Sequence, residues 1–434
     1  MTEEYIHHSI ITFQFSFLPL SFISPLVLLL VAFILGLLPV CSRTEFVLLH
    51  TQVFPASSPL YFPSSIATFK SICNVIKSEC NYFNTMYFIK SILVTGSAGF
   101  IGANLVKRLF KELNGAIILG IDNMNTYYDV SLKEYRLREL EKLVPQGITY
   151  KFFRGSIADR ELVNSLFEEY KFDIVVNLAA QAGVRYSIEN PDVYVENNII
   201  GFYNILEACR HYPVEHLVYA SSSSVYGGNR KVPFSTDDRV DNPVSLYAAT
   251  KKSNELMAHC YSKLYSIPST GLRFFTVYGP AGRPDMAYFG FTNKLLKGET
   301  IQIYNYGNCR RDFTYVDDIV EGIVRVMDKA PEKKTGEDGL PIPPYAVYNI
   351  GGGQPENLLD FVQTLQEELV RAKVLPEYYD FEAHKKLVPM QPGDVPTTYA
   401  DTSALERDFG FTPKITLREG LRAFAQWYKS YYKP

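Results

Sequence analysis

The chain has few features that would bind nucleic acid or metal ions. Its 434 residues include 43 basic and 46 acidic side chains, for a formal net charge of −3, and no long run of Lys or Arg occurs. Nucleic-acid binding needs a concentrated positive field, so we expect no nucleic-acid partner. The cysteines lack the paired spacing of metal ligands and the density of a disulfide framework: Cys41, Cys73, Cys80, Cys209, Cys260 and Cys309. We therefore expect reduced thiols and no metal site.

Hydrophobic residues make up 47% of the chain, which is enough for a large core. Residues 1–85 form a hydrophobic extension in which Ser9–Ser42 carries no charge. Its segment 20–40 is long enough to span a bilayer, and the single arginine that follows favours a cytoplasmic catalytic domain. Two interpretations stay open: a membrane anchor, or upstream sequence translated in error before Met86.

A glycine-rich turn follows the first strand expected downstream of Met86. Residues 91–95 have the composition of a buried strand, and an amphipathic helix is expected after the turn. Gly96 permits the turn, Gly99 lets the backbone approach a pyrophosphate, and Gly102 lets the helix pack close to the strand. This pattern predicts a dinucleotide site at a helix N-terminus.

The next expected strand, Ala116–Asp122, ends in a carboxylate twenty residues past Gly102. A carboxylate at this spacing is typical of the group that binds the ribose 2′-hydroxyl. Asp122 therefore favours NAD over NADP.

Strands and helices alternate beyond Asp122, which predicts a parallel sheet. The expected elements are a helix capped by Ser131 with Glu134, strand 148–153, helix 160–169, strand 174–178, a helix after Pro191, and strand 216–220. From Thr276 the elements shorten, with an exposed insert at 331–344 and a helix at 358–371. We predict an α/β fold: a Rossmann-type doubly wound parallel sheet at 86–275, and a smaller C-terminal substrate-binding α/β domain mainly at 276–434.

Tyr247 and Lys251 lie four residues apart, so on a helix they share one face. A free tyrosine titrates near 10, so a general base at neutral pH needs a pKa lowered by roughly 3 units, part of which a neighbouring ammonium supplies. A serine run, Ser221–Ser224, follows strand 216–220 at the edge where ligands bind in such sheets. An isolated Tyr/Lys pair would be an ordinary surface feature, but the upstream glycine turn favours a catalytic interpretation.

Five further motifs accompany the glycine turn, Asp122, Ser222, Tyr247 and Lys251: Asp122–Asp129, Ala179–Ser187, Gly279–Met286, Arg311–Asp318 and Met390–Val395. With these residues in this order, the chain from about Met86 onward resembles the extended short-chain dehydrogenases that act on nucleotide sugars. Within that family it is most similar to the UDP-glucuronate 4-epimerases.

The resemblance implies an NAD-dependent isomerase that inverts C4 of UDP-glucuronate through a 4-keto intermediate, giving UDP-galacturonate. Tyr247 would take the proton of the sugar 4-hydroxyl, Ser222 would bind the same oxygen, and Lys251 would hold the nicotinamide ribose and lower the tyrosine pKa. The implied cofactor contacts are Gly96, Gly99, Phe100, Ile101, Gly102, Asp122, Asn123, Ile157, Leu178, Ala179, Ala180 and Lys251.

For the sugar nucleotide, the resemblance implies contacts from Arg185, Ser223, Ser224, Thr276, Arg283, Arg311 and Asp394. The family also implies a homodimer paired through a four-helix bundle. One departure is Ser156, which stands where relatives commonly have an aspartate near the adenine.

Three other functions are compatible with these residues. A UDP-glucose/galactose 4-epimerase or a UDP-glucuronate decarboxylase would use the same scaffold, although related dehydratases and decarboxylases carry acids where this chain has Ser223 and Ser224. A non-catalytic NAD(H)-sensing protein would belong to a different class. The intact set of Ser222, Tyr247 and Lys251 argues against a sensor.

Overall fold

The computed structural model describes residues 90–390 and 395–434. These residues belong to one compact unit, Met86–Pro434. The hydrophobic segment 20–40 and Asp394 lie outside the described residues. Within the described part, no helix is both long and apolar enough to cross a membrane.

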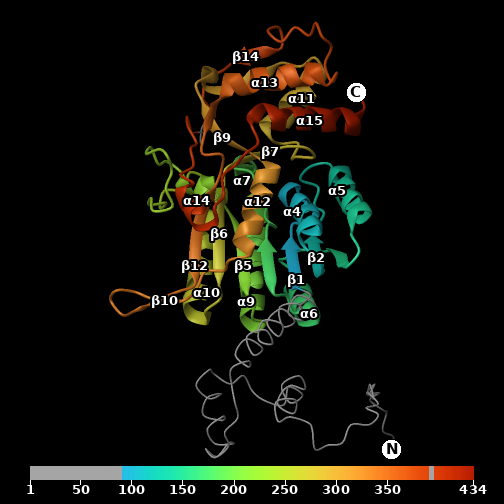
Figure 1. The fold of residues 1–434 in the computed structure, drawn as a ribbon. Coiled ribbons are helices and arrows are strands. Elements are labelled where there is room, and N and C mark those ends of the chain that lie inside the picture. The colour runs from blue at the N-terminus through green and yellow to red at the C-terminus, as the bar shows by residue number, and fades with distance from the viewer. Residues whose placement is uncertain (1–89, 391–394) are drawn as a thin grey trace, which may run out of the picture. The chain divides into compact units, whose positions relative to one another are not determined.

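A seven-stranded sheet lies at the centre of this unit, in the order β12-β6-β5-β4-β1-β2-β3 (Figure 1). Every neighbouring pair in it is parallel. The order reverses between β1 and β4, and ligands bind at such a reversal, outside the carboxyl ends of the strands. The predicted Rossmann-type sheet is confirmed, and its strands are β1 Lys90–Thr95, β2 Ala116–Asp122, β3 Ile148–Arg154, β4 Ile174–Asn177, β5 His216–Ser222, β6 Ser269–Phe274 and β12 Tyr345–Ile350.

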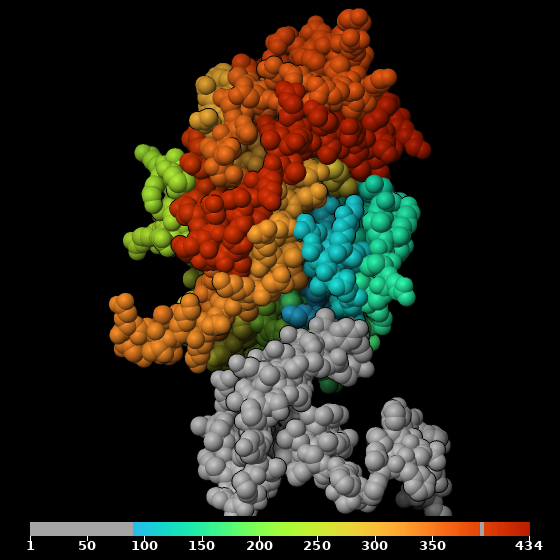
Figure 2. All heavy atoms as spheres, in the orientation of Figure 1, coloured from blue at the N-terminus to red at the C-terminus, as the bar shows by residue number. Residues whose placement is uncertain are grey.

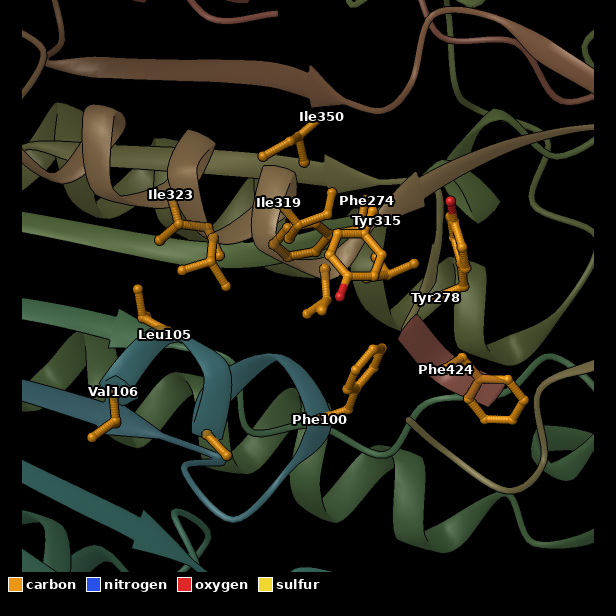
Figure 3. Packing of buried hydrophobic residues seen from close by; sticks show 14 of the residues in the cluster. Phe100, Leu105, Val106, Phe274, Tyr278, Tyr315, Ile319, Ile323, Ile350 and Phe424 are labelled. Atoms are coloured by element: carbon orange, nitrogen blue, oxygen red, sulfur yellow. The ribbon is translucent and has the colours of Figure 1, made fainter. Parts of the chain in front are cut away.

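Helices cover both faces of the sheet because successive side chains of a strand point to opposite faces. In β1, Ile92 and Val94 join one hydrophobic cluster, whereas Leu93 joins the other. Figure 3 shows Ile319 and Ile323 packing within the first cluster, beside Leu105 and Ile350. Helices α4 Phe100–Glu112 and α12 Val316–Met327 cover that face, and the other face is covered by α6 Arg160–Tyr170, α9 Gly201–His211 and α10 Leu246–Tyr265.

Helices and short strands from the C-terminal part of the chain lie beyond the carboxyl ends of the strands (Figure 1). They are helices α11 Ala287–Leu296, α13 Leu358–Arg371 and α15 Leu417–Tyr432, with strands β7 Thr276–Tyr278, β8 Ile301–Ile303, β9 Arg310–Tyr315, β13 Pro355–Asn357 and β14 Lys385–Leu387. Helix α14 Ser403–Phe409 instead contacts β12 of the central sheet. The chain also returns from this part to the central sheet as β12, which pairs with β6. The 331–344 insert contains a small exposed hairpin, β10 Lys334–Thr335 and β11 Pro341–Ile342, which projects from the surface in Figure 2.

Local capping explains where the helices begin. The predicted cap of α5 Val130–Leu143 by Ser131 is wrong, because Asp129 occupies the N-cap position and its carboxylate accepts a hydrogen bond from the Ser131 amide at 2.9 Å. The bounds predicted for α13 are confirmed. Asn357 caps this helix at its N-terminus, and its Oδ1 accepts a hydrogen bond from the Leu359 amide at 2.8 Å. Strand β5 runs two residues further than expected and ends at Ser222.

Candidate active site

The carboxyl ends of β1, β2, β4 and β5 open into one cleft, which the first turn of α10 also lines. The structure brings the predicted cofactor residues together on its wall: Gly96, Gly99, Phe100, Ile101, Gly102, Asp122, Asn123, Ile157, Leu178, Ala179, Ala180 and Lys251. Ser222, Tyr247 and Arg283 line the same cleft, as does Ser156.

The glycine turn provides room for a closely approaching anion. Gly96 has a φ of 67°, and a Cβ there would lie 2.9 Å from the Ala179 amide nitrogen. A Cβ at Gly102 would lie 2.2 Å from the Gly96 carbonyl oxygen, so no side chain fits between this turn and α4. Gly99 is the N-cap of α4, and no side chain among the described residues caps that helix end. Uncapped amides at a helix N-terminus attract phosphate groups, so these residues fit the pyrophosphate of a dinucleotide.

A buried carboxylate and a buried ammonium meet at the end of β2. Asp122 is 8% exposed, and its Oδ1 accepts from the Met124 amide at 2.9 Å and lies 3.4 Å from Lys133 Nζ. The same ammonium donates to Asn125 Oδ1 at 3.0 Å. We did not predict Asn125 or Lys133 from the sequence, although Asn125 lies inside the 122–129 motif.

Helix α10 positions the proposed base and its lysine. Ser245 caps the helix by accepting from the Ala248 amide at 3.1 Å, which places Tyr247 in the first turn and Lys251 one turn later. The Lys251 ammonium donates to the Ala220 carbonyl at 2.8 Å. Ser222 caps a short helical turn, Ser223–Tyr226, through the Ser224 amide at 3.1 Å.

The protonation of Tyr247 differs from our expectation. Burial raises the pKa of Tyr247 above its ordinary value, although the Ser222 hydrogen bond and the charge of Arg283 act in the opposite direction. Lys251 is buried as well, and this lowers the pKa of its ammonium to about 8. In the protein alone the net shift of the Tyr247 pKa is upward, because desolvation outweighs the Ser222 hydrogen bond and the charge of Arg283, and the lowering by Lys251 stays a prediction.

Arg283 lines the same cleft and is held by a carboxylate that we did not predict. Its Nε and Nη2 donate to the two oxygens of Asp285 at 3.0 and 2.6 Å, and the Tyr127 hydroxyl donates to Asp285 Oδ2 at 3.1 Å. Burial alone would lower the pKa of Arg283, but Asp285 and nearby tyrosines raise it, so the guanidinium stays charged. Asp285 lies two residues after Arg283 in the motif 279–286, which was the available signal.

The remaining predicted substrate residues do not line this cleft. Arg185 is exposed and lies over the Tyr304 ring at 5.5 Å, and Arg311 Nη1 donates to the Pro396 carbonyl at 3.1 Å. Thr276 begins β7, and Ser223 and Ser224 lie in the turn after Ser222. The described residues contain no cluster of three or more His, Cys, Asp or Glu side chains placed to hold a metal ion.

A second buried carboxylate supports the catalytic helix from behind. Glu255 lies on α10 four residues after Lys251 and is 2% exposed. It accepts from the Ser221 hydroxyl at 2.6 Å and from Arg273 Nε and Nη2 at 2.8 and 2.9 Å. Burial alone would raise the pKa of Glu255, but the Arg273 and Ser221 hydrogen bonds hold it below its ordinary value. The network joins α10 to the strand that carries Ser222.

The site combines a glycine turn, a carboxylate at the end of β2 and a Tyr/Lys pair. A comparison of the chain with models of known protein families gives a result that agrees with this set of residues. The chain belongs to the NAD dependent epimerase/dehydratase family, whose model matches residues 92–351. Among its relatives, the protein CapI of Staphylococcus aureus is 51% identical over 348 residues, covering 79% of this chain and 99% of the relative.

Other relatives narrow the class further. A UDP-glucuronate 4-epimerase of Arabidopsis thaliana is 48% identical over 350 residues, covering 79% of this chain and 76% of the relative. Among solved structures, the UDP-glucuronic acid 4-epimerase of Bacillus cereus in complex with UDP-glucuronic acid and NAD matches with a TM-score of 0.67. It is 32% identical, and the match covers 79% of this chain and 100% of that one. The UDP-glucose 4-epimerase of Thermotoga maritima matches with a TM-score of 0.65 at 29% identity, covering 79% of this chain and 99% of that one.

Proposed function

We propose that this protein is an NAD-dependent isomerase that inverts C4 of UDP-glucuronate, producing UDP-galacturonate through a 4-keto intermediate. The observation that carries the proposal is that Ser222, Tyr247 and Lys251 line one cleft together with a glycine turn that fits a dinucleotide and with the charged Arg283. The UDP-glucuronate 4-epimerases named among the relatives support the same substrate.

The reaction would begin with Tyr247, whose phenolate takes the proton of the sugar 4-hydroxyl. Ser222 hydrogen-bonds the same oxygen, and Lys251, which donates to the Ala220 carbonyl, would hold the nicotinamide ribose. When bound, NAD⁺ supplies a hydride acceptor for C4, a hydride donor for the return step, and a positive charge that favours the phenolate. The Tyr247 phenol then returns its proton after the keto sugar has turned in the cleft. Because no net oxidation occurs, the protein should retain its nucleotide between turnovers.

Arg283 provides the uronate preference in this account. A planar guanidinium suits a carboxylate because it donates hydrogen bonds from a rigid fork, and Asp285 already fixes the direction of that fork through Nε and Nη2. The 4-keto uronate is a β-keto acid, which loses carbon dioxide readily. The chain has Ser223 and Ser224 where related dehydratases and decarboxylases carry acids, which disfavours dehydration and decarboxylation.

Substitution of Arg283 tests the uronate assignment. Turnover of UDP-glucuronate and of UDP-glucose would be measured for the wild type, Arg283→Lys and Arg283→Met. The proposal predicts that Arg283→Met lowers kcat/KM for the uronate far more than for the neutral sugar, with Arg283→Lys between them. Equal losses on both substrates would contradict this role for Arg283.

We also propose that the protein is a homodimer paired through α9 and α10. Four large apolar side chains of α10 are exposed: Leu246 at 36%, Leu256 at 61%, Leu264 at 64% and Tyr265 at 40%. On the adjoining segment 195–203, which contacts α10, further exposed apolar side chains are Val195, Ile200 and Tyr203. Exposed apolar side chains on two contacting helical segments favour an interface, and a two-fold axis would pair them with their own copy as a four-helix bundle.

Three further expectations about the chain stay predictions. They are the domain boundary between 275 and 276, the cytoplasmic location of the catalytic part, and the two interpretations of residues 1–85. Intact mass of the native protein would identify its first residue, and fractionation of membranes would test the segment 20–40 as an anchor.

A further inference from the structure

Asp285 holds the Arg283 guanidinium by one of its two bidentate edges. The Nε and Nη2 groups of Arg283 donate to the two carboxylate oxygens of Asp285 at 3.0 and 2.6 Å. A guanidinium has five N–H donors in a rigid plane, and its other edge, formed by Nη1 and Nη2, can also bind a carboxylate. Among the described residues, no acceptor receives a hydrogen bond from Nη1. Because Arg283 lines the cleft, this second edge is the one left for an anionic ligand.

Tyr127 holds Asp285 in turn, and it comes from a separate loop. It follows β2, whereas Arg283 and Asp285 follow β7. The Tyr127 hydroxyl donates to Asp285 Oδ2 at 3.1 Å, the oxygen that also accepts from Arg283 Nη2. Burial raises the pKa of Tyr127 to about 12, so its hydroxyl stays a donor at neutral pH. Burial alone would raise the pKa of Asp285, but Arg283 and this hydroxyl hold it below its ordinary value. The acceptor is therefore a carboxylate.

Aromatic packing fixes the Tyr127 ring and connects it to the catalytic tyrosine. The centres of the Tyr127 and Tyr186 rings lie 4.7 Å apart. Tyr194 continues the row, at 6.3 Å from Tyr186 and 6.0 Å from Tyr247. These separations are within the range of favourable contact between aromatic rings. The first and last members of the row, Tyr127 and Tyr247, both line the cleft. Tyr127 therefore cannot move away from Asp285 without disturbing this row.

We propose that Tyr127 is a positioning residue for substrate specificity: its hydroxyl fixes Asp285, which leaves the free edge of Arg283 for the carboxylate of a uronate. This inference deepens the proposed function and rests on it. Asp285 and the uronate compete for one cation, and they share it only if each takes its own edge. The selectivity then comes from the direction of the guanidinium and not from excess positive charge. A neutral sugar makes no use of this arrangement.

Binding of UDP-glucuronate and of UDP-glucose tests this role on the full 434-residue chain. Dissociation constants are measured by isothermal titration calorimetry in the Tyr247→Phe background, which prevents turnover during the titration. Tyr127→Phe changes no charge, so a change in preference reports the lost hydrogen bond. We expect UDP-glucuronate to bind about tenfold more weakly, the size of one hydrogen bond to a charged group, and UDP-glucose to change by less than about twofold.

Asp285→Asn separates direction from charge. The substitution removes a negative charge beside Arg283, so a purely electrostatic effect would strengthen UDP-glucuronate binding. The proposal predicts weaker binding instead. The asparagine amide keeps one acceptor oxygen and cannot bind both N–H groups of the Arg283 edge, so the guanidinium loses its fixed direction. This variant also decides the question if Tyr127→Phe does not fold.

A matched control comes from a Tyr–Asp–Arg set that is not part of the cleft lining. The Tyr348 hydroxyl donates to Asp408 Oδ2 at 2.9 Å. Arg407 Nε and Nη2 donate to the same carboxylate at 2.8 and 3.1 Å. Tyr348→Phe and Asp408→Asn therefore remove the same kinds of contact elsewhere, and both dissociation constants should stay unchanged.

The outcomes distinguish this inference from the proposed function. An unchanged preference in Tyr127→Phe, or tighter UDP-glucuronate binding in Asp285→Asn, would overturn the positioning role while the uronate assignment stands. If the Tyr247→Phe background binds the uronate no more tightly than the neutral sugar, the uronate assignment itself fails and this inference fails with it.

Discussion

At the scale of single residues, Tyr247 must gain its reactivity from its surroundings. Burial raises its pKa in the protein alone, and Ser222 and Arg283 only partly oppose this effect. The Lys251 ammonium is itself buried and donates to a backbone carbonyl, and its effect on the pKa of Tyr247 stays a prediction. Bound NAD⁺ adds the missing positive charge, so the base is strongest when the oxidant is present.

Tyr247→Phe removes the base while keeping the ring. We expect turnover to fall by roughly 10²- to 10⁴-fold, the usual contribution of a positioned acid–base group. The variant should still fold and carry its nucleotide, as circular dichroism and nucleotide release would show. Tyr265→Phe, at the far end of the same helix, should keep near-normal turnover. Full activity in Tyr247→Phe would reject the assigned role, and it would leave the sensor hypothesis to be tested through nucleotide-dependent behaviour.

Ser222→Ala tests the electrostatic account through pH. The Ser222 hydrogen bond stabilises the phenolate and so lowers the pKa of Tyr247. Its loss should therefore raise that pKa, and more alkaline conditions would be needed to form the base. The rising limb of the pH profile of kcat/KM should move to higher pH, with a lower rate at neutral pH. A limb that stays in place or moves to lower pH would contradict this reasoning.

At the scale of elements, α10 links catalysis to the core. Tyr247, Lys251 and Glu255 follow one another at intervals of four along one face. The first two line the cleft, and Glu255 binds Ser221 and Arg273 on the adjoining strands. Displacement of α10 would therefore move the base and its lysine together.

Glu255→Ala tests the strength of this link. The substitution leaves the Arg273 guanidinium buried and uncompensated, so we expect the free energy of unfolding to fall by about 3–5 kcal/mol. Glu139→Ala is the control, because it breaks an exposed ion pair with Lys142. It should change the free energy of unfolding by no more than about 0.5 kcal/mol. Urea denaturation measures both. Similar stabilities for the two variants would show that the buried pair does not hold α10 in place.

The same elements show where sequence reasoning succeeds. The glycine turn, Asp122 and the Tyr247/Lys251 pair could be predicted because short-range spacing determines their geometry. The cap of α5 was misplaced because two polar residues, Asp129 and Ser131, compete locally and only the backbone path decides between them. Glu255 and Lys133 were missed because their partners come from other elements of the fold. The residues next to them in the sequence do not indicate these tertiary contacts.

At the scale of the whole molecule, the parallel sheet and a ligand site at its carboxyl edge followed from the alternating pattern, whereas the return of β12 to the sheet did not. Strand Tyr345–Ile350 pairs with β6 after a long excursion through the C-terminal part of the chain. Nothing local in those residues indicates which sheet they join. Arg185 and Arg311, which were assigned by motif, are not among the residues that line the cleft, and their contacts with the substrate stay predictions.

The proposed dimer gives a test at this scale. Leu256→Glu together with Leu264→Glu places charge on the apolar face of α10, so we expect a monomer where the wild type is a dimer. Size-exclusion chromatography with light scattering measures the mass directly. Leu340→Glu, equally exposed at 62% on the β10–β11 hairpin, should leave the mass unchanged. A monomeric wild type, or a double variant that still pairs, would contradict the assignment of this face.

The most direct measurement of the central claim is proton NMR of UDP-glucuronate with the purified 434-residue protein and no added NAD, with carbon dioxide measured in parallel. We predict new anomeric signals that reach an equilibrium mixture with UDP-galacturonate, without carbon dioxide release. That result would establish C4 inversion and retained nucleotide in one experiment. Conversion of UDP-glucose alone, or release of carbon dioxide with loss of the uronate, would contradict the account.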